Sequence, residues 1–134
     1  MRSLLFVLYC ALTAVLGAAE FKDLAYYQEG FARSGDEAYL AERCKLDLST
    51  PDEVRNFPTL VWFHGGGLTG GGKAWPRIVD RQKIAVAAVN YRLSGDRASC
   101  PDYLYDAAAA VSWVVKNIAG YGGDPRKVYV SGHS

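Results

Sequence analysis

Three short runs of β-branched and aromatic residues constrain the fold of this 134-residue chain most strongly. They cover residues 59–63, 84–90 and 127–131, and each is expected to form a buried strand; the first two show no alternation of polar and apolar positions. Strands that are covered on both faces have this pattern. Because candidate helices separate the runs, the sequence predicts an α/β fold in which a mostly parallel sheet is flanked by helices on both faces.

A helix is predicted in each interval between these runs. The stronger one begins with Asp102 at the N-cap position, carries apolar residues at helical spacing, and meets Gly120 where it should end. The other, residues 75–83, is short, and Pro76 is tolerated there only in the first turn.

A fourth strand is predicted just before the turn that follows Leu48. Apolar and charged residues alternate strictly here, with Cys44, Leu46 and Leu48 on one side and Lys45 and Asp47 on the other. This pattern indicates a half-buried strand whose charged side chains face solvent.

The first 19 residues have the composition of a secretory signal peptide. Arg2 precedes an apolar run, and the small residues that signal peptidase requires come just before Glu20. Cleavage there would leave 134 − 19 = 115 residues, residues 20–134, in a secreted or periplasmic protein. The alternative is an uncleaved membrane anchor, although the apolar run is shorter than the roughly 20 residues that a span needs.

The mature chain would keep two of the three cysteines. Cys10 leaves with the leader, whereas Cys44 and Cys100 remain in a compartment where disulfides persist. Their separation in the sequence does not give their separation in space, so one disulfide and two free thiols are both open.

The charge of the chain is nearly balanced. Fifteen Lys and Arg residues stand against 14 Asp and Glu residues, which gives a net charge of +1. This excludes the basic footprint of a nucleic-acid-binding protein, and a composition that is 50% hydrophobic excludes a disordered tail. No pattern in the sequence implies a metal ion or a cofactor.

The last predicted strand runs directly into Gly132-His133-Ser134. A strand followed by Gly-x-Ser is the front half of the nucleophile elbow G-x-S-x-G, in which the serine projects from a strained turn. The neighbours two positions away must be small to avoid a clash, and Gly132 meets that need. The alternative is an irregular terminal loop without a function.

A glycine-rich segment, His64-Gly65-Gly66-Gly67, follows the strand predicted at residues 59–63. Glycines allow backbone N–H groups to approach a substrate closely, and such donors stabilise the oxyanion of acyl transfer by about 2.7–4 kcal/mol each. His64 is expected to order this loop through hydrogen bonds rather than to act as a general base. The alternative is a mobile glycine loop without a catalytic role.

Together these segments resemble the α/β-hydrolase superfamily, and within it secreted esterases of the carboxylesterase, feruloyl-esterase-like and hormone-sensitive-lipase-like groups. The resemblance covers residues 40–134 roughly. It implies that Gly65 and Gly66 supply oxyanion donors and that Ser134 attacks the ester. The segments that carry it are VWFHGGG (61–67), VNYRLS (89–94), DAAAAVSW (106–113), NI (117–118), GGDP (122–125) and GHS (132–134).

The same resemblance places the catalytic acid and histidine after the serine in the chain. We therefore expect residues 20–134 to be the N-terminal part of an α/β-hydrolase domain, truncated after the strand that leads to the nucleophile elbow. Alone, the chain should be inactive, and its last strand should expose an edge that promotes aggregation. The substrate would be a small-molecule or polysaccharide-linked ester, with no nucleic acid and no stable membrane insertion, and the oligomeric state is open.

The sequence is also compatible with two other functions. The segment from Gly67 to Ala74 matches the G-x-x-x-x-G-K part of a phosphate-binding P-loop, but Ala74 stands where Ser or Thr should hold Mg²⁺. A non-catalytic hydrolase-fold recognition module is the second alternative, because a fold does not determine a function.

Overall fold

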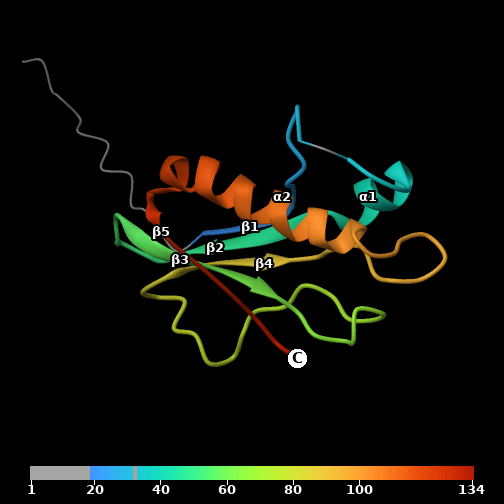
Figure 1. Ribbon diagram of the computed structural model, residues 1–134. Coiled ribbons are helices and arrows are strands. Elements are labelled where there is room, and N and C mark those ends of the chain that lie inside the picture. Colours follow the sequence, from blue (N-terminus) through green and yellow to red (C-terminus); the bar gives the residue numbers. More distant parts are fainter. Residues whose placement is uncertain (1–18, 32) are drawn as a thin grey trace, which may run out of the picture.

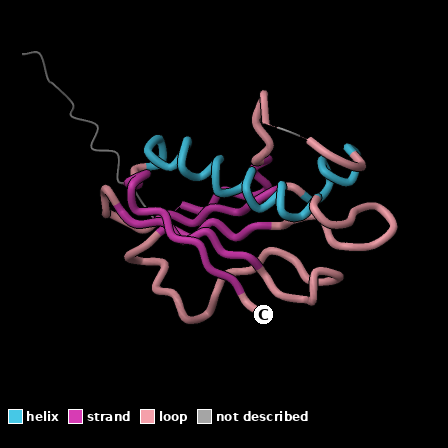
Figure 2. The backbone as a smooth tube through the Cα atoms, viewed as in Figure 1, coloured by secondary structure: helices cyan, strands magenta, loops and turns pink. Residues whose placement is uncertain are grey.

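The β-branched runs form the centre of a five-stranded sheet (Figures 1 and 2). The computed structural model describes residues 19–31 and 33–134, so the predicted signal peptide lies outside the described residues except for Ala19. The elements are β1 (Ala19–Ala25), α1 (Glu37–Arg43), β2 (Lys45–Thr50), β3 (Phe57–Phe63), β4 (Ala85–Val89), α2 (Asp102–Asn117), the 3₁₀ helix η1 (Ile118–Tyr121) and β5 (Gly123–Gly132).

The strands are arranged in the order β1-β2-β4-β3-β5. β3 pairs in parallel with both β4 and β5, whereas β2 pairs antiparallel with β1 and with β4. The α/β fold class is therefore confirmed, and the sheet is mixed: its half with β3, β4 and β5 is parallel, and its half with β1 and β2 is antiparallel.

The edge strand β1 was not predicted from the sequence. Phe21 and Leu24 pack against the hydrophobic core, but a bulge between them shifts the register of β1 against β2. Asp23, inside the bulge, has a φ of 55°. The extra residue breaks the two-residue period by which strands are recognised.

Helix α2 covers one face of the sheet (Figure 1). Ala110, Trp113 and Val114 of this helix pack with Leu46 and Val61 in the hydrophobic core. The other face was also predicted to be covered by a helix, but it is covered by the connection between β3 and β4, residues 64–84, which contains no helix and runs below the sheet in Figure 2.

The helix predicted at residues 75–83 does not form, and the segment consists of turns. The Trp75 ring is close to two cations, with Lys22 Nζ 4.6 Å and the Arg81 guanidinium carbon 4.8 Å from its centre. The carbonyl of Asp80 closes a turn by accepting hydrogen bonds from the N–H groups of Lys83 and Ile84. Lys22 belongs to β1, so this segment packs against a strand that is distant in sequence.

Strand β2 confirms the prediction for Leu46 and Leu48, which are fully buried, but corrects the prediction for Asp47. Asp47 is only 9% exposed because the connection below the sheet covers it. Its carboxylate accepts hydrogen bonds from Lys73 Nζ at 2.6 Å and from Lys22 Nζ at 3.4 Å. Asp47, which the alternating pattern placed on the solvent side, therefore forms an internal ion pair. The residues before Cys44 belong to helix α1.

Both ends of α2 differ slightly from the prediction. Pro101 occupies the N-cap, and the Asp102 carboxylate accepts hydrogen bonds from the N–H of Ser99 and the hydroxyl of Ser34. At the other end, Gly120 does not stop the helix. The turn continues as η1, and Gly122, with a φ of 96°, ends it.

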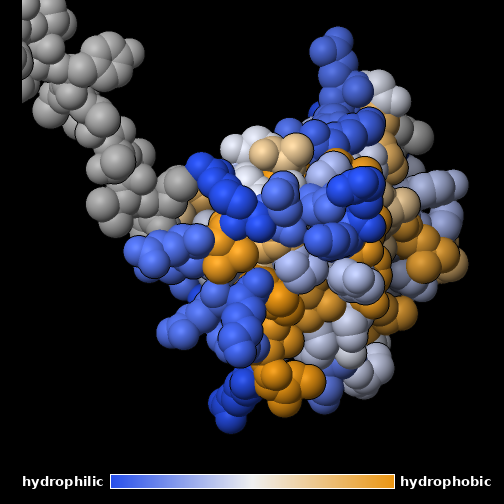
Figure 3. Space-filling view, turned by 90° about the vertical axis from the view of Figure 1, so that its left-hand side faces the viewer, coloured by the Kyte–Doolittle hydropathy of each residue, from blue (hydrophilic) through white to orange (hydrophobic). Residues whose placement is uncertain are grey.

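Strand β5 is longer than predicted and lies at an edge of the sheet. Most of its residues from Pro125 onward are exposed, including Tyr129 at 61% and Val130 at 58%. The prediction of a buried strand at residues 127–131 is therefore wrong for the described chain, because β5 is an edge strand that pairs only with β3 there. The molecular face toward the left of Figure 1 has hydrophobic side chains gathered in its lower part and hydrophilic ones around them (Figure 3).

Candidate functional site

The two glycine-containing motifs meet at the carboxyl ends of β3 and β5. Phe63, the last residue of β3, is paired with Gly132, the last residue of β5. The N–H of His133 donates a hydrogen bond of 3.1 Å to the Phe63 carbonyl, so the pairing extends one step beyond the strands. The chain segments that follow these strands, residues 64–72 and Ser134, are therefore neighbours at the edge where open α/β sheets bind ligands.

Ser134 has a φ of 72°, in the left-handed region that residues with a side chain rarely adopt. It is exposed, and it lines a cavity together with His133. Non-glycine residues held in this conformation cluster at functional sites. Ser134 thus follows the strand in a left-handed conformation, and the predicted nucleophile elbow stays a prediction.

The backbone of Gly65 lies against Ser134. A Cβ atom at position 65 would be 3.2 Å from Ser134 Cβ and 2.7 Å from His133 Nδ1, so no side chain fits there. Gly66 has a φ of 126°, and its carbonyl accepts hydrogen bonds from the N–H groups of Gly70 and Thr69. The segment 64–72, called the glycine loop below, is thus folded back on itself beside the serine.

His64 is buried beneath this loop. Its ring stacks on Tyr91 with centroids 4.5 Å apart, and Nδ1 lies 2.8 Å from the Gly65 carbonyl oxygen. Because a carbonyl only accepts, Nδ1 carries the proton and donates. Burial lowers the pKa of His64, and the nearby charge of Arg43 lowers it further, although the hydrogen bond to Gly65 opposes this.

These contacts fit the ordering role predicted for His64. Its Nε2 is buried and has no hydrogen-bond partner among the described residues. Within the same residues no hydrogen bond joins His64 to Ser134, so the structure provides no route by which it could take the serine proton.

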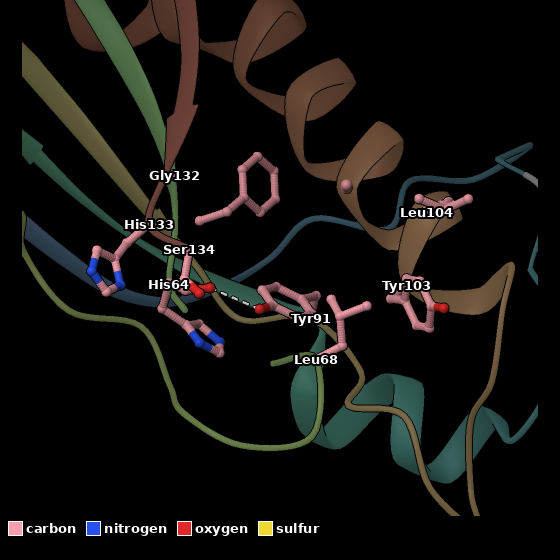
Figure 4. Close-up of a pocket in the computed structure, with 10 residues that line it drawn as sticks. His64, Leu68, Tyr91, Tyr103, Leu104, Gly132, His133 and Ser134 are labelled. Atoms are coloured by element: carbon pink, nitrogen blue, oxygen red, sulfur yellow. Dashed lines mark hydrogen bonds between the residues drawn. The ribbon is translucent and has the colours of Figure 1, made fainter. Parts of the chain in front are cut away.

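A cavity of about 350 Å³ opens beside Ser134 (Figure 4). Side chains from α2 and from the loops after β3 and β4 form its walls, and most of them are apolar or aromatic. Such a wall binds the non-polar part of a substrate. The residues that line it are Phe63, His64, Leu68, Tyr91, Tyr103, Leu104, Ala107, Gly132, His133 and Ser134.

The structure brings Ser134 close to Gly65, and Gly66 is the next residue of the glycine loop. It also adds residues that the motifs did not assign to the site: Tyr91, Leu68 and Tyr103. Tyr91 lies in the VNYRLS segment, so the resemblance marked its position. Leu68 and Tyr103 have no sequence signal, because only the packing of the loop against α2 places them at the cavity.

The P-loop alternative is wrong. Lys73 would have to reach a phosphate, but its Nζ is 2.6 Å from Asp47 and 2.9 Å from Asp23. A P-loop must also lead into a helix whose N-terminus faces the phosphate, and the residues after Lys73 form no helix.

The two cysteines beyond the predicted leader are free thiols. Cys44 is buried and Cys100 is exposed, which resolves the question that the sequence left open. Burial raises the pKa of the Cys44 thiol to about 12, so it stays protonated and unreactive at neutral pH.

Over residues 19–31 and 33–134, no three or more His, Cys, Asp or Glu side chains are grouped as metal ligands. In the same part of the chain, no helix has the length and apolar character that crossing a membrane requires.

Known proteins are similar to this chain in sequence and in fold. The BD-FAE family model matches residues 46–134. The liver carboxylesterase of Sus scrofa is 36% identical over 103 residues, which cover 66% of this chain and 18% of that protein. The cocaine esterase of Oryctolagus cuniculus is 35% identical over 113 residues, which cover 71% of this chain and 21% of that protein. The chain thus spans about a fifth of the length of these relatives.

Among solved structures, a thermophilic PNB esterase superposes with a TM-score of 0.68 and 23% sequence identity. The match covers 88% of this chain and 35% of the esterase. At this identity the superposition shows that the two chains share a fold.

Proposed function

Because the chain belongs to the BD-FAE family of α/β-hydrolases, we propose that its protein hydrolyses carboxylic esters with Ser134 as the nucleophile. One observation carries the proposal: Ser134, with a φ of 72°, stands at the end of β5 against the backbone of Gly65. A nucleophile and a glycine loop able to present N–H groups are the two parts that acyl transfer needs side by side.

The proposed reaction has two halves. Ser134 Oγ attacks the ester carbonyl carbon while its proton passes to a histidine, and the N–H groups of Gly65 and Gly66 hold the negative oxygen. The histidine returns the proton to the departing alcohol, which leaves an acyl-serine. Water then attacks the acyl-serine and gives a proton to the same histidine. The bond between the acyl group and Ser134 Oγ breaks, the acid is released, and the histidine returns its proton to Oγ.

The histidine of this scheme is placed outside residues 1–134. The two histidines of the chain are His64, which is held under the glycine loop, and His133, whose Nδ1 packs at Gly65. A base and an orienting acid supplied by sequence after Ser134 would complete the triad in the order that α/β-hydrolases use. On this view the 134-residue chain alone is inactive.

The test compares the 134-residue chain with the longest protein that its gene encodes, using 4-nitrophenyl acetate as the ester. We expect hydrolysis by the long protein only, and a loss of at least about a thousandfold in its Ser134→Ala variant. Ser131→Ala is the matched control, because Ser131 is an exposed serine on the same strand and should leave the rate unchanged. Full activity of Ser134→Ala would overturn the role of Ser134 as nucleophile, whereas no activity in the long protein would support a non-catalytic recognition module instead.

The cavity indicates how such an ester would bind. Its apolar wall, with Leu68 and Tyr103 opposite Ser134, suits the non-polar portion of a small-molecule or polysaccharide-linked ester (Figure 4). Rates measured on acetyl, butyryl and aryl esters of one alcohol would reveal which group the cavity prefers.

Secretion is part of the proposal. Residues 1–19 would be removed before Glu20, which leaves all but the first residue of β1 in the mature protein. N-terminal sequencing of protein recovered from the medium or periplasm checks this, and an intact Met1 would contradict it.

A further inference from the structure

We propose that Arg43 is a positioning residue for the glycine loop: its guanidinium ties the far end of the loop to Tyr91 and thereby holds Gly65 and Gly66 in place beside Ser134. Its effect on catalysis rests on the ester hydrolysis proposed above.

Arg43 is the last residue of α1 and makes two hydrogen bonds across segments that are distant in sequence. Its Nε donates to the Tyr91 carbonyl at 3.1 Å, and its Nη2 donates to the Gly71 carbonyl at 3.2 Å. Donors on a charged group form stronger hydrogen bonds than neutral ones, and the rigid guanidinium fixes the distance between the two carbonyls.

Tyr91 holds the near end of the same loop. Its hydroxyl donates a buried hydrogen bond of 2.7 Å to the His64 carbonyl, and its ring stacks on the His64 imidazole (Figure 4). Tyr91 therefore contacts the loop where it begins, while Arg43 joins Tyr91 to the loop near its end.

The backbone contacts inside the loop pass this constraint to the oxyanion positions. Gly71 packs directly on His64 and on the Gly65 carbonyl: a Cβ at position 71 would lie 2.6 Å from His64 Nδ1 and closer still to that oxygen. A shift of Gly71 toward His64 would therefore displace the Gly65 peptide. Because catalytic donors act only within a narrow range of positions, such a shift would lower the rate.

Two other hydrogen bonds also anchor the loop region. The N–H of Ser94 donates to the Leu68 carbonyl at 2.7 Å, and the N–H of Lys73 donates to Asn90 Oδ1 at 2.6 Å. Neither bond reaches Gly71, so loss of Arg43 should loosen the loop without unfolding it.

The test uses Arg43→Met and Arg43→Lys in the full-length protein, with Arg97→Met as control. Arg97 also carries a positive charge against α1, through Asp36 and Glu42, but it makes no hydrogen bond to the glycine loop. We expect Arg43→Met to lower kcat about tenfold with little change in KM, Arg43→Lys to recover part of the loss, and Arg97→Met to have no effect. Affinity for an alkyl boronic acid, which mimics the tetrahedral intermediate, should fall in parallel with kcat.

A second readout needs no activity. In Arg43→Met, amide hydrogen exchange should accelerate at residues 64–72, and the pKa of His64, measured by NMR, should rise because a nearby positive charge is removed. Unchanged kcat and unchanged exchange in this variant, together with an inactive Ser134→Ala variant, would overturn the role of Arg43 while the ester hydrolase function stands. An active Ser134→Ala variant would instead overturn the proposed function, and the exchange data would still decide whether Arg43 holds the loop.

Discussion

Two residues at the candidate site have left-handed backbone conformations. Ser134 and Leu68, with φ values of 72° and 63°, are both non-glycine residues, and both line the cavity. Leu68 is held in this conformation by the hydrogen bond that its carbonyl accepts from Ser94. Backbone strain of this kind persists only where the surroundings enforce it. At Leu68 it directs an apolar side chain to the wall of the cavity.

Substitution of Gly65 tests the close approach of the loop to the nucleophile. A Cβ in Gly65→Ala would lie 2.7 Å from His133 Nδ1 and 3.2 Å from Ser134 Cβ, so the loop or the serine must shift. We expect kcat of the full-length protein to fall by about a hundredfold. Gly72→Ala is the control in the same loop, since a Cβ there meets only Asn90 Oδ1 at 3.6 Å. Equal kcat values for the two variants would be evidence against the proposed position of the Gly65 peptide.

The buried His64 predicts a pH dependence of stability. Burial lowers its pKa in the folded state, so below about pH 6.5 the unfolded chain binds a proton that the folded chain resists. The contribution of His64 is therefore fully present above that pH and declines as the pH falls below it. Urea unfolding between pH 7.5 and 5 should show a steeper loss of stability for the native protein than for His64→Asn. Parallel curves would contradict this prediction.

At the scale of elements, one buried ion pair joins three segments. The Arg92 guanidinium contacts the Asp106 carboxylate with Nη2 at 2.7 Å and Nε at 3.0 Å, and both side chains are fully buried. Tyr27 donates its hydroxyl to the same carboxylate at 2.6 Å. The segment after β1, the loop after β4 and helix α2 thus share one charged centre, and that loop carries Tyr91 to the site.

Removal of one partner should destabilise the protein strongly. Asp106→Leu leaves the Arg92 charge buried without its carboxylate, which costs about 3–5 kcal/mol of unfolding free energy. Arg126→Met is the control, because its pair with Asp124 is formed by an arginine side chain that is 87% exposed. It should change the free energy little. Chemical denaturation measures both, and similar values for the two variants would refute the importance of the buried pair.

At the scale of the whole molecule, one strand, β5, leads to the candidate site and also forms an exposed edge of the sheet. β5 carries Ser134 at its end, and within the described residues it pairs only with β3. Tyr129 and Val130 are exposed along it, on a strand whose outer edge has no partner in the described part of the chain. Such an edge is a template for pairing with a second chain.

The 134-residue chain should therefore aggregate through β5. A charge in Val130→Lys opposes edge pairing, so this variant should remain monomeric at higher concentration. Val115→Lys is matched to it, since Val115 is an exposed valine on α2 and not on a sheet edge. Light scattering against concentration compares the two, and equal gains in solubility would show that lost surface hydrophobicity, and not the strand edge, is responsible.

Local patterns were sufficient where an element depends on its own residues. The apolar runs predicted β3, β4 and β5, the helical spacing predicted α2, and the two glycine-containing motifs predicted which strand ends carry Ser134, Gly65 and Gly66. These patterns failed where the conformation of a segment depends on parts of the chain that are distant in sequence. The bulge at Asp23 interrupts the alternation of β1, and residues 75–83 form turns beside that strand in place of the predicted helix.

The sequence by itself determined the α/β class and the residue types of the candidate site, because strand burial and the freedom of glycine are properties of short segments. Only the tertiary structure decided that Asp47 forms an internal ion pair, that Cys44 and Cys100 are separate thiols, and that Arg43 and Tyr91 donate hydrogen bonds to the glycine loop. Each of these features depends on distances in space between residues that are far apart in the chain. The folded sheet sets these distances, and spacing along the sequence does not reveal them.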